Sequence, residues 1–153
     1  MPITLVRAGL IIPASFPDEV YTLVPYRSDY NVDGVQGCDT GGEFNNNTSI
    51  WTPKAGAISW VAQVWAGEFG GAIPNFCLTM FKNGVDFQAA LPSAGLPGAI
   101  FGQTCSVRCM GFDIANGTDS YFMMLYMTTV GGNTGRPSTD PRHCWFNGVS
   151  FGQ

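Results

Sequence analysis

The sequence predicts an all-β fold, an antiparallel β-sandwich of jelly-roll topology. Short apolar and aromatic runs alternate with turn-forming segments, aromatic residues make up 13% of the chain, and 20 glycines and 10 prolines are spread along it. This composition is typical of many short strands joined by turns. No segment shows the apolar spacing of a long helix. A chain of 153 residues is expected to form one domain with a sizeable core.

The strands are predicted from runs with a period of two residues. In the clearest run, residues 57–65, one face carries Ile58, Trp60, Ala62 and Val64. Asn83-Gly84 predicts a hairpin turn between two such runs, because both residues of that turn must accept a positive φ. The other predicted strands are 19–24, 76–81, 85–87, 100–110, 120–128 and 144–151, and the segment 33–47 is predicted to be a loop.

The run 120–128 is apolar on both faces of the predicted strand. An antiparallel strand with one solvated face should alternate between apolar and polar residues. We therefore expect one face to be covered by the core and the other by a second layer or by a partner chain. The residues predicted to form a homotrimer contact are Tyr121, Phe122, Met123, Met124, Leu125 and Tyr126.

The N-terminal stretch, residues 1–17, is unusually apolar for a chain end and is broken by three prolines. Two interpretations remain open for it. It is either an edge strand of the domain's own sheet or an extended arm that adds to a sheet of a neighbouring subunit. We predict an arm at 1–17 and a jelly-roll domain at 18–153. The arm residues expected to bind a capsid are Ile3, Leu5, Val6, Leu10, Ile11 and Ile12.

Composition suggests contact with another protein chain and argues against other kinds of partner. Only 12% of residues are charged, which suggests that part of the surface is covered by another chain. The net charge is −4 and no basic run exists, so nucleic acid is not an expected partner. No apolar stretch approaches the ~20 residues of a membrane span. The first residues lack the pattern of a signal peptide, and the five cysteines lack metal-type pairs, so we expect synthesis in a cytoplasm and no disulfide framework.

No catalytic residue, metal site or cofactor is predicted. The single histidine, His143, adjoins Cys144, and neighbours on a strand point to opposite faces. Asp113, Asn116 and Asp119 lack calcium-loop spacing and are expected to form a turn. The three glutamates, Glu19, Glu43 and Glu68, show no pairing for glycoside hydrolysis.

The tryptophans leave open a function in carbohydrate binding. A sugar-stacking platform could include some of the four tryptophans, although aromatic residues on strands are more often part of a core. The residues concerned are Trp51, Trp60, Trp65 and Trp145.

The order of these signals resembles the trimeric jelly roll of complement globular-head domains and the tumour-necrosis-factor superfamily. The resemblance spans roughly residues 50–153. Its motifs are Trp51-Thr52-Pro53-Lys54-Ala55-Gly56 before a strand, the turn Lys82-Asn83-Gly84, the turn Asn116-Gly117-Thr118-Asp119 before an aromatic strand, and the ending Trp145-Phe146-Asn147-Gly148-Val149-Ser150-Phe151.

The profile is also similar to trimeric decoration and fibre proteins of tailed bacteriophages, which are made in the host cytoplasm and often carry an apolar arm. This resemblance implies a non-enzymatic virion protein on the capsid surface, whose partners are two further copies of itself and the major capsid protein. It implies a capsid decoration (cement) or head-fibre protein. The alternative is a receptor-binding or glycan-binding head, with a host surface glycan as partner bound through the loops at 33–47, 67–74 and 131–141.

Overall fold

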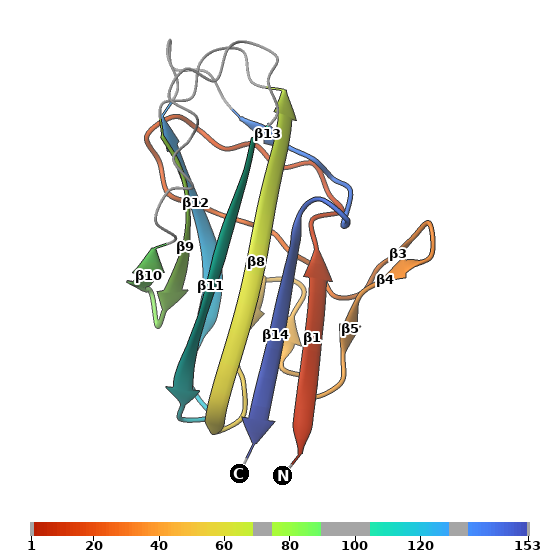
Figure 1. The fold of residues 1–153 in the computed structure, drawn as a ribbon, viewed down its shortest axis with the longest axis vertical. Coiled ribbons are helices and arrows are strands. Elements are labelled where there is room, and N and C mark those ends of the chain that lie inside the picture. The colour runs from red at the N-terminus through yellow and green to blue at the C-terminus, as the bar shows by residue number, and fades with distance from the viewer. Residues whose placement is uncertain (1, 69–74, 90–104, 129–134, 153) are drawn as a thin grey trace.

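The computed structural model describes residues 2–68, 75–89, 105–128 and 135–152. These residues form two antiparallel sheets packed face to face, with no helix among them (Figure 1). The sheet nearer the viewer in Figure 1, the front sheet, has the order β11-β8-β14-β1-β5, with β13 beside β8. The back sheet has the order β10-β9-β12-β7-β6, with β2 beside β12. The predicted all-β jelly-roll sandwich is confirmed.

The front sheet contains β1 (Ile3–Gly9), β5 (Cys38–Asp39), β8 (Gly56–Glu68), β11 (Cys105–Ala115), β13 (Arg136–Pro137) and β14 (Trp145–Gly152). The back sheet contains β2 (Thr22–Leu23), β6 (Phe44–Asn45), β7 (Ile50–Trp51), β9 (Asn75–Lys82), β10 (Val85–Ala89) and β12 (Tyr121–Thr128). A separate hairpin, β3 (Asn31–Val32) and β4 (Val35–Gln36), projects from the side of the sandwich (Figure 1).

The core lies between the sheets and follows the period of two residues. Ile58, Trp60, Ala62 and Val64 of β8 are all buried, as the sequence pattern predicts. Gly148 is needed opposite Trp51, because a Cβ there would lie 3.0 Å from the indole ring. The remaining large core side chains include Leu10, Phe16, Tyr26, Leu78, Met80, Tyr121, Met123, Leu125 and Phe146.

The local predictions hold best where turn chemistry is strong. Asn83 and Gly84 have φ of 53° and 81°, which is the geometry of the predicted hairpin turn between β9 and β10. The predicted strand at 19–24 is reduced to Thr22–Leu23, and Glu19 just before it has a left-handed φ of 55°. The predicted loop at 33–47 contains short strands. Residues 100–104 of the strand expected at 100–110 lie outside the described residues.

The N-terminal residues do not extend away from the domain as an arm. All seven residues of β1 pair with β14, and β1 also pairs with β5, so β1 lies inside the front sheet. After β1 the chain crosses to the other end of the sandwich, where Phe16 bridges Gly135. This is nearest to the first of the two interpretations, because β1 belongs to the domain's own sheet, but β14 and β5 flank it on either side and it is not an edge strand. The physical reason is the seven-residue ladder with β14, which joins the first and last strands of the same chain.

Candidate functional site

The residues predicted to form the trimer contact lie on β12, in the middle of the back sheet. Tyr121, Met123 and Leu125 are at most 2% exposed and belong to the core. They cannot meet another chain in the folded protein, which corrects the prediction for these three positions. Phe122, Met124 and Tyr126 point to the opposite side and are half-buried.

The outer side of β12 is covered largely by the chain itself. The ring of Tyr21 lies 5.0 Å from that of Tyr126 and 5.5 Å from that of Phe81, between ring centroids. Phe81 stacks on Phe122 at 5.6 Å. Leu23 of β2 pairs with Met124 in the plane of the back sheet. Part of the cover expected over this strand is therefore supplied by Tyr21 of the same chain.

The outer side of the front sheet also presents apolar side chains, and the described residues form no comparable second layer over Phe112 and Ile114. On β11, Met110, Phe112 and Ile114 are 63%, 82% and 68% exposed. Strand pairing extends them into three rows across β11, β8, β14 and β1, which we call the outer apolar face. The rows are Ile114-Ala57-Phe151-Ile3, Phe112-Ser59-Val149-Leu5 and Met110-Val61-Asn147-Arg7.

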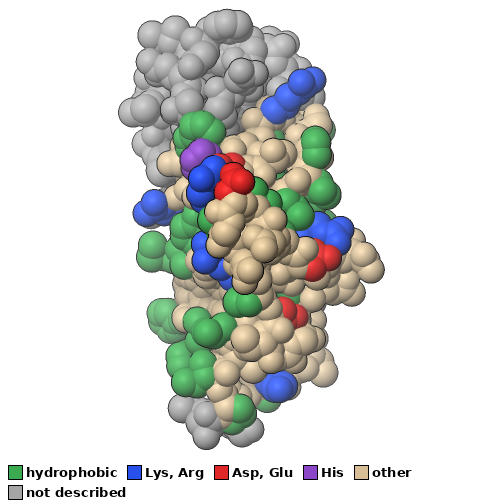
Figure 2. All heavy atoms as spheres, turned by 90° about the vertical axis from the view of Figure 1, so that its right-hand side faces the viewer, with side chains coloured by type: hydrophobic (Ala, Val, Ile, Leu, Met, Phe, Trp, Pro, Cys, Tyr) green, Lys and Arg blue, Asp and Glu red, His purple; other side chains and the backbone are tan. Residues whose placement is uncertain are grey.

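Figure 2 shows this side of the sandwich in profile, with hydrophobic side chains protruding along the left margin of the view. Exposed apolar groups gathered over one sheet in this way are typical of an interaction surface. Among the described residues of these rows the only charged side chain is Arg7. The sequence held a signal for this face, since both parities of the run from Val107 to Ile114 carry apolar residues, but the predicted strand ended at residue 110, before Phe112 and Ile114.

The arm residues divide between the core and the surface. Val6 and Leu10 are buried in the protein's own core, and Ile11 is half-buried. Ile3 and Leu5 are 57% and 46% exposed and belong to the outer apolar face. The remaining residue of the predicted set, Ile12, lies beyond β1 and is 41% exposed.

A charged cluster joins the two sheets at the β10–β11 edge. Lys82 Nζ lies 2.7 Å from Asp113 Oδ2 and 3.3 Å from Asp119 Oδ2. Tyr121 OH donates a hydrogen bond of 2.7 Å to Asp113, and Asn83 Nδ2 donates one of 2.8 Å to Asp119. The cluster ties β9, β11 and β12 together beside two exposed apolar residues of β10.

The pKa values in this cluster follow from those contacts. The hydrogen bond to Asp113 raises the pKa of Lys82 above its ordinary value. Burial acts to raise the pKa of Asp113, but hydrogen bonds from Lys82 and Tyr121 outweigh it, so the pKa lies below the usual range. The hydrogen bond from Asn83 is the main cause of the lowered pKa of Asp119. The folded state therefore stabilises both carboxylates in their charged form.

The described residues contain no assembled catalytic or metal site. Burial raises the pKa of the Cys144 thiol to about 11, and its Sγ bonds to the backbone of Trp65. His143 contacts Ser138 through Nδ1 at 3.3 Å on an exposed turn. Among the described residues, no three His, Cys, Asp or Glu side chains lie close enough to hold a metal ion. No helix of the described part of the chain could span a membrane.

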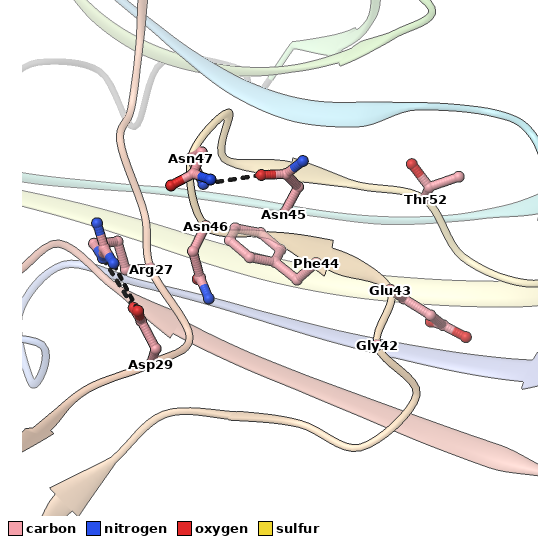
Figure 3. Close-up of a pocket in the computed structure, with 9 residues that line it drawn as sticks. All are labelled: Arg27, Asp29, Gly42, Glu43, Phe44, Asn45, Asn46, Asn47 and Thr52. Carbon is pink, nitrogen blue, oxygen red and sulfur yellow. Dashed lines mark hydrogen bonds and ion pairs between the residues drawn. The ribbon is translucent and has the colours of Figure 1, made fainter.

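A polar pocket of about 710 Å³ opens beside β6 (Figure 3). An ion pair of 2.6 Å between Arg27 and Asp29 forms one wall, and amide side chains form another. Glu43 accepts hydrogen bonds from Thr4 and Trp51 in the interior, so its carboxylate serves the core. Most of its lining residues belong to the segment 33–47, one of the loops that the sequence offered for glycan binding. Its lining residues are Arg27, Asp29, Gly42, Glu43, Phe44, Asn45, Asn46, Asn47 and Thr52.

Comparisons with solved structures show the fold of this chain. It is similar to murine APRIL, with a TM-score of 0.66 and 11% identity over 98% of this chain and 100% of the other. It is similar to Eiger TNF from S. frugiperda, with a TM-score of 0.63 and 8% identity over 100% and 95% of the two chains. The globular domain of zebrafish complement 1qA protein gives 0.57 and 12% identity over 98% and 96%. No family model matches the sequence, and no curated protein matches it.

Proposed function

We propose that this protein is a non-enzymatic virion protein that works as a homotrimer on the outer surface of a phage capsid, as a decoration or head-fibre protein. The observation that carries the self-association is the outer apolar face of the front sheet. Phe112, at 82% exposure, is its most exposed large side chain. Exposing such a face to water is unfavourable by roughly 25 cal/mol per Å² of apolar surface, so covering it with another copy would be stabilising.

A threefold assembly requires two different patches on each protomer, since its contacts are heterologous. The chain offers two. One is the β1–β14 side of the outer apolar face, with Leu5 and Val149. The other is the opposite edge of the sandwich, where Val85 and Phe87 of β10 are 66% and 41% exposed. The trimeric families that the sequence resembles support three copies rather than two.

Self-association is tested with Phe112→Asp. We expect the wild-type mass in solution to be that of three chains. The variant should be a folded monomer, with association weakened about 100-fold or more, because a carboxylate would be left unpaired in a desolvated contact. The measurement is light scattering coupled to gel filtration, with circular dichroism to verify folding. Val20→Asp is the matched control, since Val20 is 49% exposed and lies outside the outer apolar face. A monomeric wild-type protein would contradict the proposal.

Capsid attachment needs a different variant. Deleting residues 1–17 would remove β1 from the front sheet and so would test folding instead of binding. Ile12→Asp changes an exposed residue of the N-terminal stretch, 1–17, that lies outside every strand. We expect it to lower occupancy on empty capsids at least tenfold while the mass of the assembly stays the same. Wild-type occupancy by this variant, and by Ile11→Asp beside it, would reject the arm as the capsid contact.

A further inference from the structure

The four tryptophans fall into two pairs with different surroundings. Trp51 and Trp60 are 0% and 4% exposed and belong to the core. Trp65 and Trp145 are half-buried and share the outer side of the front sheet, where Trp65 also packs against the core. Core packing accounts for the first pair, whereas the second pair presents part of each indole to solvent.

The second pair and the histidine lie close together on one side of the front sheet, in what we call the aromatic strip. Trp145 pairs with Gln63 across β14 and β8, and Trp65 follows two residues later on the same side of β8. The two tryptophans are therefore diagonal neighbours, whose positions lie ~7–8 Å apart. The imidazole of His143 lies 4.5 Å from the ring of Trp65, between ring centroids. His143 is exposed, and it is the purple side chain in Figure 2.

Buried polar contacts hold this strip in place. Gln63, only 9% exposed, donates to the carbonyl of His143 at 2.8 Å and accepts from Arg108 Nε at 2.5 Å. Cys144 Sγ forms hydrogen bonds of 3.2 Å with the backbone of Trp65, just before β14 begins at Trp145. A surface fixed by its own hydrogen bonds loses little conformational entropy when a ligand binds.

We propose that the strip formed by Trp65, Trp145 and His143, with Arg108 beside it, binds carbohydrate. The apolar face of a pyranose ring matches the flat, half-exposed indoles, and its hydroxyl groups match the polar ends of Arg108 and His143. Aromatic rings with one apolar face and a polar end suit a ligand of this mixed character. The two tryptophans of the strip stand on β8 and β14, whereas the sequence placed glycan contacts in the loops at 33–47, 67–74 and 131–141, of which residues 69–74 and 131–134 lie outside the described residues.

The strip lies beyond the three apolar rows. Both termini are at one end of the sandwich, and β14 begins with Trp145 away from that end (Figure 1). Charged and hydrogen-bonding side chains, Arg108 and Gln63, replace the apolar residues at this level of the sheet. This change of chemistry favours a polar, hydroxylated ligand over a further protein copy. The inference does not depend on capsid attachment, only on the strip staying uncovered in the assembly.

The test uses the full chain in its native assembly. Binding is measured on an array of immobilised hexose and N-acetylhexosamine oligosaccharides, followed by titration calorimetry with the strongest glycan. We expect Trp145→Ala and Trp65→Ala each to weaken binding at least tenfold, with an unchanged mass of the assembly. Tyr21→Ala is the control, because Tyr21 is an exposed aromatic on the back-sheet side, and it should bind like the wild type.

Three results would overturn the proposal. The first is that no glycan on the array retains the wild-type assembly when the concentration of binding sites is about 1 mM. A Kd weaker than about 1 mM then counts as no binding. The second is unchanged binding in both tryptophan variants. The third is a smaller assembly in Trp145→Ala, which would make the strip part of the self-association contact. The mass measurement separates this failure from that of the trimer, because Phe112→Asp tests the trimer without touching the strip.

Discussion

β11 and β12 both carry apolar residues on two faces, yet their outer faces differ in how far the same chain covers them. Over β12, Tyr21 of the same chain packs against the outer side chain of Tyr126 and against Phe81 beside it. Over β11 the described part of the chain lays down no comparable layer, and Phe112 and Ile114 stay largely exposed. A two-sided apolar strand thus indicates that cover is required. Whether the same chain or another chain provides it depends on where distant segments pass.

The largest expected effect separates the core face from the outer face. Leu125→Ala should lower the free energy of unfolding by about 2–5 kcal/mol, because it leaves a cavity in a core position that is 1% exposed. Phe112→Ala should change the unfolding free energy of the dissociated protein by less than about 0.5 kcal/mol, as is usual for surface positions. Urea denaturation of dilute protein measures both values. Similar losses for the two variants would break the comparison.

The second prediction concerns the link between the two strands, the Lys82 cluster. Lys82→Met removes the cation that faces Asp113 and Asp119, and it should cost about 2 kcal/mol at neutral pH, since two partly buried carboxylates lose their partner. Equilibrium urea denaturation at pH 7 measures this loss in the free energy of unfolding. Lys54→Met is the control, because Lys54 is exposed and makes no described ion pair.

The same cluster predicts a pH dependence with a definite sign. Both aspartates have lowered pKa values in the folded protein, so their stabilisation is complete above the unfolded-state pKa of about 3.9 and is lost as the pH falls below it. In Lys82→Met the loss of stability between about pH 5 and pH 2 should be shallower than in the wild type. Parallel stability curves for the two proteins would show that Lys82 does not lower these pKa values.

The smallest effect tests the cover of β12. Tyr21→Ser removes one ring that contacts Tyr126 and Phe81, and aromatic pairs contribute about 0.5–1.5 kcal/mol each beyond their buried area. We expect a loss of about 1 kcal/mol in the free energy of unfolding, together with greater binding of a hydrophobic dye. Val20→Ser, a neighbouring exposed position without ring contacts among the described residues, serves as the control. Equal behaviour of the two variants would mean that Tyr21 does not cover the strand.

Much of the fold could be predicted from local signals in the sequence. The alternation around Trp60 and the Asn83-Gly84 turn predicted β8 and the β9–β10 hairpin because both depend on near neighbours. The trimer contact was misplaced for Tyr121 and Leu125, since a strand's own residues do not reveal which face meets the core. The aromatic strip joins Trp65 to His143, two positions 78 apart in the numbering, and their proximity depends on the pairing of β8 with β14.

By itself the sequence determined the strands, their turns and the need to cover more apolar surface than one core can hold. The tertiary structure decided where that surface lies. It placed β1 inside the front sheet by pairing it with β14, it laid Tyr21 over β12, and it left Phe112 exposed. The physical reason is that side-chain alternation is fixed by the backbone within a strand, whereas the cover over each face comes from segments that reach it only through long-range pairing.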